Sequence, residues 1–171
     1  ALPAPRSGGR GRVTYPGDLM TDSPTTAAKL TPRAQAKLER RGEILVAAAR
    51  LMARRGFHAV RLDDIGAEVG ISGPGMYRYF SAKEEVLAEM LLDISHRLRD
   101  GGRAAMERGG APTEVLDALL AVHVDFVATE PDLISVQFRD LDALPAGPRH
   151  EVRSLQREYA DLWVETLLRL R

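Results

Sequence analysis

Long or hydroxylated hydrogen-bond donors gather in one short stretch of this sequence. They are Arg61, Ser72, Tyr77, Arg78, Tyr79 and Lys83. Guanidinium groups can bind guanine edges or phosphates, and hydroxyl and ammonium groups can bind phosphates. The chain offers no positioned nucleophile, phosphate-binding loop or cluster of metal ligands. These residue types therefore predict contact with a nucleic acid rather than an enzyme, and neither a metal nor a cofactor is expected.

A short helix is predicted at about residues 62–69, at the start of the stretch that carries these donors. Leu62, Ile65 and Val69 recur at i, i+3 and i+7, which places them on one face of a helix. The small Gly66 lies where a second helix would approach most closely. We therefore expect this helix to bury one face against a neighbour.

A second helix is predicted at about residues 74–80. Gly70 interrupts the first pattern, Ile71 packs inward, and Met76 and Phe80 form an i, i+4 apolar pair. Two short helices joined by a turn that contains glycine are typical of a helix-turn-helix, whose second helix enters the DNA major groove.

The apolar pair also predicts which side chains of the second helix face outward. If Met76 and Phe80 point into the core, Arg78 lies about 200° around the helix from Met76 and faces solvent. Arg78 can then reach guanine or phosphate, and Tyr77 and Tyr79 lie on the flanks, where their hydroxyls can contact phosphates.

Residues of about 40–95 resemble the DNA-binding domain of the TetR family of transcriptional repressors. The resemblance is carried by an amphipathic helix that ends in Gly56-Phe57, by Gly-Ile-Ser-Gly-Pro-Gly-Met-Tyr-Arg-Tyr-Phe at 70–80, and by Ser-Ala-Lys-Glu-Glu at 81–85. It implies an all-α fold, with a three-helix helix-turn-helix domain followed by a helical effector-binding and dimerisation domain. It also implies a homodimer that binds a palindromic double-stranded DNA operator and is released by a small-molecule effector.

The resemblance assigns roles to several residues. Gly73, Pro74 and Gly75 correspond to positions that approach base edges, and Tyr77 and Lys83 to positions that hold the DNA backbone. The alternatives are an unrelated helical bundle, such as an adaptor without sequence-specific DNA binding, or an enzyme.

The ends of the two short helices carry further expectations. Ser72 can cap the second helix, whose free N–H groups favour a phosphate. Arg61 stands where relatives commonly have Ser or Thr, so the first helix loses a cap while the guanidinium could bind phosphate directly.

Charge is divided unevenly along the chain. Residues 1–61 carry twelve Lys or Arg against four Asp or Glu, a net charge of +8, although the whole chain has zero net charge. A basic half joined to an acidic half is typical of a nucleic-acid-binding domain with a separate body. The chain has no cysteine and no apolar run of membrane-spanning length, so we expect a cytoplasmic protein without a membrane partner.

The rest of the chain is read as helices and loops. Residues 1–30 are predicted to be a disordered basic tail, residues 31–88 the DNA-binding domain and residues 89–171 the helical body. Thr31-Pro32 starts a helix that runs to about Arg55, with Arg40 and Arg41 available outward.

The body is predicted to contain four helices. Ser81 and Glu84 form a capping box for the first of them, which Gly101-Gly102 weakens. Thr113 caps the second, and the remaining two cover about 132–143 and the stretch beyond the loop at 145–148. Each shows an apolar stripe and none shows strand alternation.

Candidate effector contacts are scattered over the body. They are His123, Phe126, Gln137, Arg139, Tyr159 and Trp163. His123 interrupts an apolar stripe; it can be a core histidine with its hydrogen bonds satisfied, a pocket contact, or a metal-binding or catalytic residue. Apolar walls with few polar groups favour an elongated apolar ligand, and analogy with similar regulators adds fatty acyl chains or acyl-CoA esters.

In the TetR family, two further helices normally follow and pair with those of a second subunit. This chain stops at Arg171, at the end of a helix whose apolar face extends to its last residues. Either the chain is truncated or the variant is short, and we expect the dimer surface to be incomplete.

Overall fold

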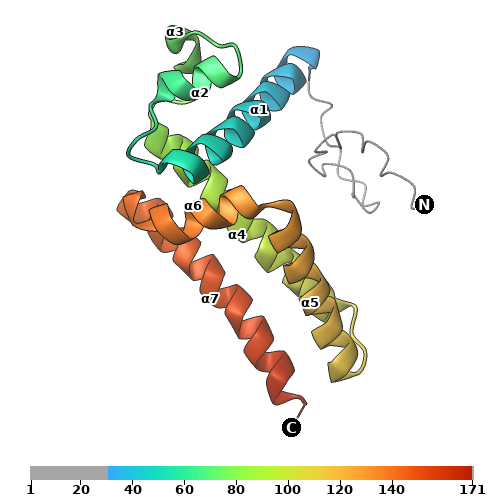
Figure 1. The fold of residues 1–171 in the computed structure, drawn as a ribbon. Coiled ribbons are helices and arrows are strands. Elements are labelled where there is room, and N and C mark those ends of the chain that lie inside the picture. Colours follow the sequence, from blue (N-terminus) through green and yellow to red (C-terminus); the bar gives the residue numbers. More distant parts are fainter. Residues whose placement is uncertain (1–30, 171) are drawn as a thin grey trace, which may run out of the picture.

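The computed structural model describes residues 31–170, so the predicted tail at 1–30 lies outside the described residues. Every regular element in this part of the chain is helical, which confirms the all-α fold. The elements are α1 (Pro32–Arg55), α2 (Leu62–Glu68), α3 (Gly73–Met76), α4 (Lys83–Glu107), α5 (Pro112–Thr129), α6 (Pro131–Asp140), the short 3-10 helix η1 (Leu141–Ala143) and α7 (Ala146–Leu168). Helices α1–α3 form a head at one end, and α5 and α7 extend away from it along α4 (Figure 1).

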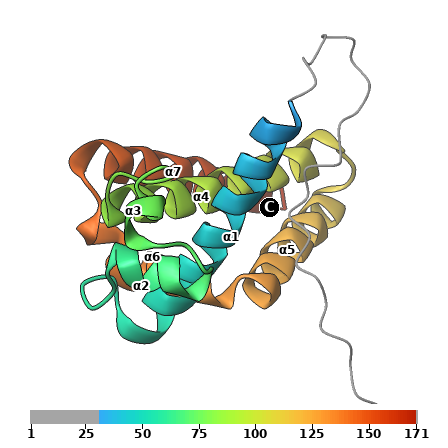
Figure 2. The ribbon, with the colours of Figure 1, turned by 90° about the horizontal axis from the view of Figure 1, so that it is seen from above.

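Helix α1 begins and ends as its sequence predicts. The Thr31 hydroxyl accepts a hydrogen bond from the Ala34 amide at 3.2 Å, and Pro32 occupies the first helical position. Gly56 ends the helix at φ 84°, a conformation that favours glycine. Viewed from above, α1 crosses α4, which continues from the head into the body (Figure 2).

The main core joins the head to the near end of the body. Its fully buried members include Ile44 of α1, Ile65 of α2, Phe80, and Leu91 of α4, and it extends to Val136 of α6. Because α6 packs on α1, the head is held on two sides, by α4 and by α6.

Gly66 is the point of closest approach between α2 and the turn that follows it, as expected. A Cβ at this position would lie 2.7 Å from the Ile71 carbonyl oxygen and 2.8 Å from Met76 Cγ. The absence of a side chain therefore allows α3 to pack against α2.

Helix α4 runs without a break through Gly101 and Gly102. A Cβ at Gly102 would lie 2.8 Å from Leu162 Cδ1 and 2.9 Å from Tyr159 Cε2. The absence of a side chain at Gly102 lets α7 approach α4 closely.

Two helix starts differ from the prediction. Helix α5 begins at Pro112 with Ala111 as its N-cap, so Thr113 is not the cap; the Glu114 carboxylate accepts from the Ala111 amide at 2.8 Å. At the start of α4, Glu85 rather than Glu84 accepts from the Ser81 amide, at 2.7 Å. In both places a carboxylate in the first turn satisfies a free backbone N–H.

The far end of the body has only a small core. Ala105, Val115 and Leu119 are buried there, with Trp163 packed against them. The predicted stripe of α5 is largely not buried, since Val127 is 48% exposed and His123 is also exposed. The pattern marked the apolar face correctly, but in the described residues nothing covers most of it.

Candidate nucleic-acid interface

The segment that follows α2 presents an outward face of polar and basic side chains. Met76 and Phe80 are buried at 0% and 1% exposure, whereas Tyr77 is 63% exposed and Arg78 is also exposed. Pro74 is exposed with them. The outward direction expected for Arg78 is therefore the one that the segment adopts.

Helix α3 is shorter than predicted, because it ends at Met76 rather than near residue 80. The chain nevertheless keeps a helical course, since the Arg78 amide donates to the Gly75 carbonyl at 3.2 Å and the Phe80 amide donates to the Met76 carbonyl at 3.0 Å. Tyr79 is half-buried and packs against the core. A single turn thus replaces the predicted longer helix without changing which side chains face outward.

Ser72 is the N-cap of α3, and its hydroxyl accepts from the Gly75 amide at 3.3 Å. Gly73 also lies close to α2, because a Cβ at this position would be 2.5 Å from a carboxylate oxygen of Asp63. A Cβ at Gly75 would lie 2.9 Å from Ile71 Cγ2. The Asp63 carboxylate could rotate away from a Cβ at Gly73, whereas a Cβ at Gly75 would crowd the turn that precedes α3.

Arg61 lies exposed at the start of α2. Its backbone amide donates to the Asp64 carboxylate at 2.8 Å, so an acidic residue in the first turn takes over the missing cap. The phosphate contact of Arg61 remains a prediction.

Lys83 is engaged by the head itself. Its ammonium donates to the carbonyls of Phe57 at 3.0 Å, Val60 at 3.1 Å and His58 at 3.4 Å, and it lies 4.4 Å from the centre of the Phe57 ring. The loop between α1 and α2 is thereby fastened to the start of α4. The predicted phosphate contact of Lys83 would have to compete with these bonds.

Replacement of Lys83 with methionine is expected to lower the free energy of unfolding by about 1–3 kcal/mol, because the carbonyls lose a charged donor. Chemical denaturation would measure this loss, and Lys37→Met on the exposed side of α1 is the matched control. An unchanged stability combined with a shallower salt dependence of DNA binding would favour the phosphate role instead.

Arg40 and Arg41 do not simply face outward as predicted. Arg40 donates to the Val69 carbonyl just after α2, and Arg41 donates to the Tyr79 carbonyl. These contacts were missed because they join residues 29 and 38 positions apart, which no local pattern reveals. Arg40 and Arg41 thus bind the backbone that follows α2 and the backbone that follows α3.

Glu85 of α4 binds the turn of residues 77–82, which we call the recognition turn. Its carboxylate accepts from both the amide and the hydroxyl of Ser81, and these hydrogen bonds, followed by the contact with Arg41, lower the pKa of Glu85. The carboxylate therefore stays charged where the turn meets the helix.

Three of the candidate effector contacts are brought together between α5 and α7. His123 Nδ1 lies 3.3 Å from the Tyr159 hydroxyl, and the two rings stack with centroids 6.1 Å apart. Trp163 meets both rings edge-on. Burial raises the pKa of Tyr159. His123 itself is exposed, so the core-histidine interpretation is wrong.

The other three candidates lie elsewhere. Phe126 packs against the main core. Gln137 is half-buried on α6, and Arg139 donates to the carbonyls of Met52 and Ala53 and pairs with Asp140 at 2.9 Å. Arg139 thus binds the carboxyl end of α1, a role that sequence reasoning missed.

A cavity of about 150 Å³ lies where α1, α4 and the start of α6 meet. Its lining includes Leu45, Met90, Leu133 and the charged Arg50 and Asp93. The cavity does not include the aromatic cluster of His123, Tyr159 and Trp163. Within residues 31–170, no three His, Cys, Asp or Glu side chains are grouped to hold a metal ion, and no helix is long and apolar enough to cross a membrane.

Two family models match the chain. Residues 44–90 match "Bacterial regulatory proteins, tetR family", and residues 109–170 match "Tetracyclin repressor-like, C-terminal domain". The matched ranges contain α2, α3 and the start of α4 in the first case, and α5 to α7 in the second.

Known proteins show the same likeness. A TetR-family regulator from Bordetella parapertussis superposes with a TM-score of 0.73 at 30% identity, covering 77% of this chain and 68% of that one. The ketosteroid transcriptional regulator KstR2 of Mycobacterium tuberculosis superposes with a TM-score of 0.70 at 26% identity, covering 76% of this chain and 67% of that one.

The transcriptional activator FasR of Mycolicibacterium smegmatis is 34% identical over 89 residues, which are 52% of this chain and 41% of FasR. The chain thus spans less than half the length of this curated relative. With a helix-turn-helix head, a helical body and two matching family models, the chain belongs to the TetR family of bacterial regulatory proteins.

Proposed function

We propose that this chain is part of a transcriptional regulator, a repressor in its simplest form, whose head binds double-stranded operator DNA. The observation that carries this proposal is the outward face of the α3 segment, where Tyr77 and Arg78 are exposed directly between the buried Met76 and Phe80. A segment anchored on both sides by core residues presents its polar side chains rigidly, as base reading requires.

The operator is proposed to be palindromic, with the protein bound as a homodimer. A two-fold symmetric dimer presents two identical heads, and each head then meets an equivalent half-site. Backbone amides at the N-terminus of α3 contribute little to this contact, because Pro74 has no N–H and the amides of Gly75 and Met76 already donate to Ser72.

Selection of bound fragments from random duplex DNA tests this function. The expected result is a two-fold symmetric consensus recovered with the unaltered protein. A pool that remains random after several rounds would contradict sequence-specific binding and favour a helical adaptor.

Arg78→Ala is expected to weaken binding to the selected site by about 1–3 kcal/mol and to relax preference at one position of each half-site. The reason is the loss of the exposed long donor on the recognition face. Lys37→Ala, which removes an exposed cation from α1, should affect all sequences alike. Competition binding against single-base variants of the site measures the difference, and a neutral Arg78→Ala would contradict the proposed reading face.

The body is proposed to bind a small, mainly apolar effector that lowers DNA affinity. Support comes from the partly exposed aromatic cluster of His123, Tyr159 and Trp163, which offers ring faces and a hydroxyl between α5 and α7. A similar regulator, KstR2, is described as a ketosteroid regulator. Fatty acyl chains and acyl-CoA esters are the proposed ligand class.

Titration with an acyl-CoA series is expected to change the fluorescence of Trp163, the single tryptophan of the chain, and to release bound DNA. Coenzyme A without an acyl chain is the matched control and should do neither. Ligand binding that leaves DNA affinity unchanged would remove the switch from this proposal.

A further inference from the structure

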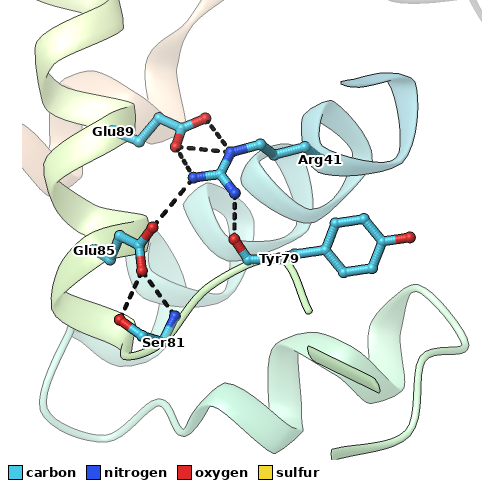
Figure 3. Close-up of polar contacts among 5 residues, drawn as sticks. All are labelled: Arg41, Tyr79, Ser81, Glu85 and Glu89. Atoms are coloured by element: carbon cyan, nitrogen blue, oxygen red, sulfur yellow. Dashed lines mark hydrogen bonds and ion pairs between the residues drawn. The ribbon is translucent and has the colours of Figure 1, made fainter. Parts of the chain in front are cut away.

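Arg41 joins three parts of the molecule through one guanidinium group. Its Nε lies 2.8 and 2.9 Å from the two carboxylate oxygens of Glu89, and Nη2 pairs with Glu89 and, at 3.4 Å, with Glu85. Its Nη1 donates to the Tyr79 carbonyl, and the guanidinium carbon lies 3.9 Å from the centre of the Phe80 ring. Figure 3 shows the contacts of Arg41 with Tyr79, Glu85 and Glu89.

The geometry of the group fixes the relative positions of its partners. A guanidinium is planar, and its donors point in set directions, so it cannot follow Glu89 without changing its bond to Tyr79. The Arg41 side chain is only 24% exposed, which limits competition from water. The position of α4 is thus linked to the backbone of the recognition turn.

We propose that Arg41 is a positioning residue, which sets the orientation of the recognition turn on α1 and α4 while making no contact with DNA itself. Tyr79 directly follows Arg78, and Phe80 anchors the end of the turn in the core. A shift of Glu89 with α4 would therefore move or release the backbone that carries Arg78. This inference rests on the proposed function, because positioning matters only if the turn reads DNA.

The direction in which Glu89→Gln changes DNA affinity distinguishes a positioning role from a purely electrostatic one. Removing a carboxylate from the head strengthens its attraction to phosphates, so Glu89→Gln should bind DNA more tightly if charge alone matters. If Glu89 holds Arg41 in place, the same substitution should weaken binding to the selected site. Glu84→Gln is the matched control, because Glu84 lies in the first turn of α4 and is not a partner of Arg41.

The experiment measures the affinity of each variant for the selected duplex and for a scrambled duplex. With Glu89→Gln we expect about a tenfold loss on the selected duplex, corresponding to one charged hydrogen bond, and no loss on the scrambled one. Arg41→Lys should show the same selective loss, because an ammonium cannot serve Glu89 and Tyr79 with a planar fork. A merely structural role would lower both affinities in parallel with thermal stability.

A spectroscopic readout tests the link without DNA. The dipeptide Tyr79-Phe80 is the single Tyr-Phe pair of the chain, so ¹³C-carbonyl tyrosine combined with ¹⁵N-phenylalanine gives one correlation that reports the Tyr79 carbonyl. We expect this resonance to shift in Glu89→Gln and to stay in place in Glu84→Gln.

Glu89→Gln that matches Glu84→Gln in both affinities and in the carbonyl resonance would overturn the proposal. If the unaltered protein binds no duplex, the proposed function fails, and the carbonyl resonance alone then decides whether Glu89 and Arg41 hold the turn. A resonance that does not respond in that case also overturns the positioning role.

Discussion

Raising the salt concentration from about 50 to about 200 mM is expected to weaken duplex binding about a thousandfold, as for a protein that neutralises six or more phosphates. Residues 31–61 alone carry eight Lys or Arg against two Asp or Glu. Arg40 and Arg41 are engaged by backbone carbonyls, whereas Arg33, Lys37 and Arg61 are exposed. The zero net charge of the whole chain does not cancel this effect, because phosphate attraction acts locally.

The measurement is a series of binding isotherms on one duplex, with circular dichroism at each salt concentration as the control for folding. The slope of log affinity against log salt gives the number of phosphates neutralised. An affinity that stays constant with salt would contradict the electrostatic part of the proposed interface.

Gly66→Ala is expected to lower the free energy of unfolding by about 2–3 kcal/mol, the upper part of the range for overpacking. A Cβ there would lie 2.7 Å from the Ile71 carbonyl oxygen, and this backbone atom cannot rotate away as a side chain would. The gain in helix propensity from glycine to alanine, about 1 kcal/mol, offsets only part of the strain.

Gly42→Ala is the matched control, since Gly42 lies inside α1 and a Cβ there would meet nothing within 4 Å. That variant should gain about 0.5–1 kcal/mol. Denaturant unfolding of both variants measures the contrast. Equal stabilities would mean that α2 and the following turn move apart at little cost.

The head could be predicted from sequence because its constraints are local. The spacing of Met76 and Phe80 placed both in the core, and Gly66 marked the close contact of α2 with the next turn. The length of α3 was overestimated, because an i, i+4 apolar pair is also compatible with one helical turn followed by looser turns.

The long-range contacts that hold the head in place could not be predicted in this way. Arg41 meets Glu89 across 48 positions of sequence, and Arg139 meets Met52 across 87. Such pairs depend on how helices pack rather than on any local pattern. For the same reason the apolar stripe of α5 was recognised, but whether a neighbour covers it was not.

The unequal size of the two buried clusters predicts that local stability differs between the two ends of the molecule. Buried residues from Ile44 to Val152 form one cluster that joins the head, α4 and α6, whereas the far end of the body is held by Ala105, Val115 and Leu119. Regions with few buried contacts undergo local unfolding at lower free energy than the rest of a protein. We therefore expect amide hydrogens near the far ends of α4, α5 and α7 to exchange with solvent faster than those of the head.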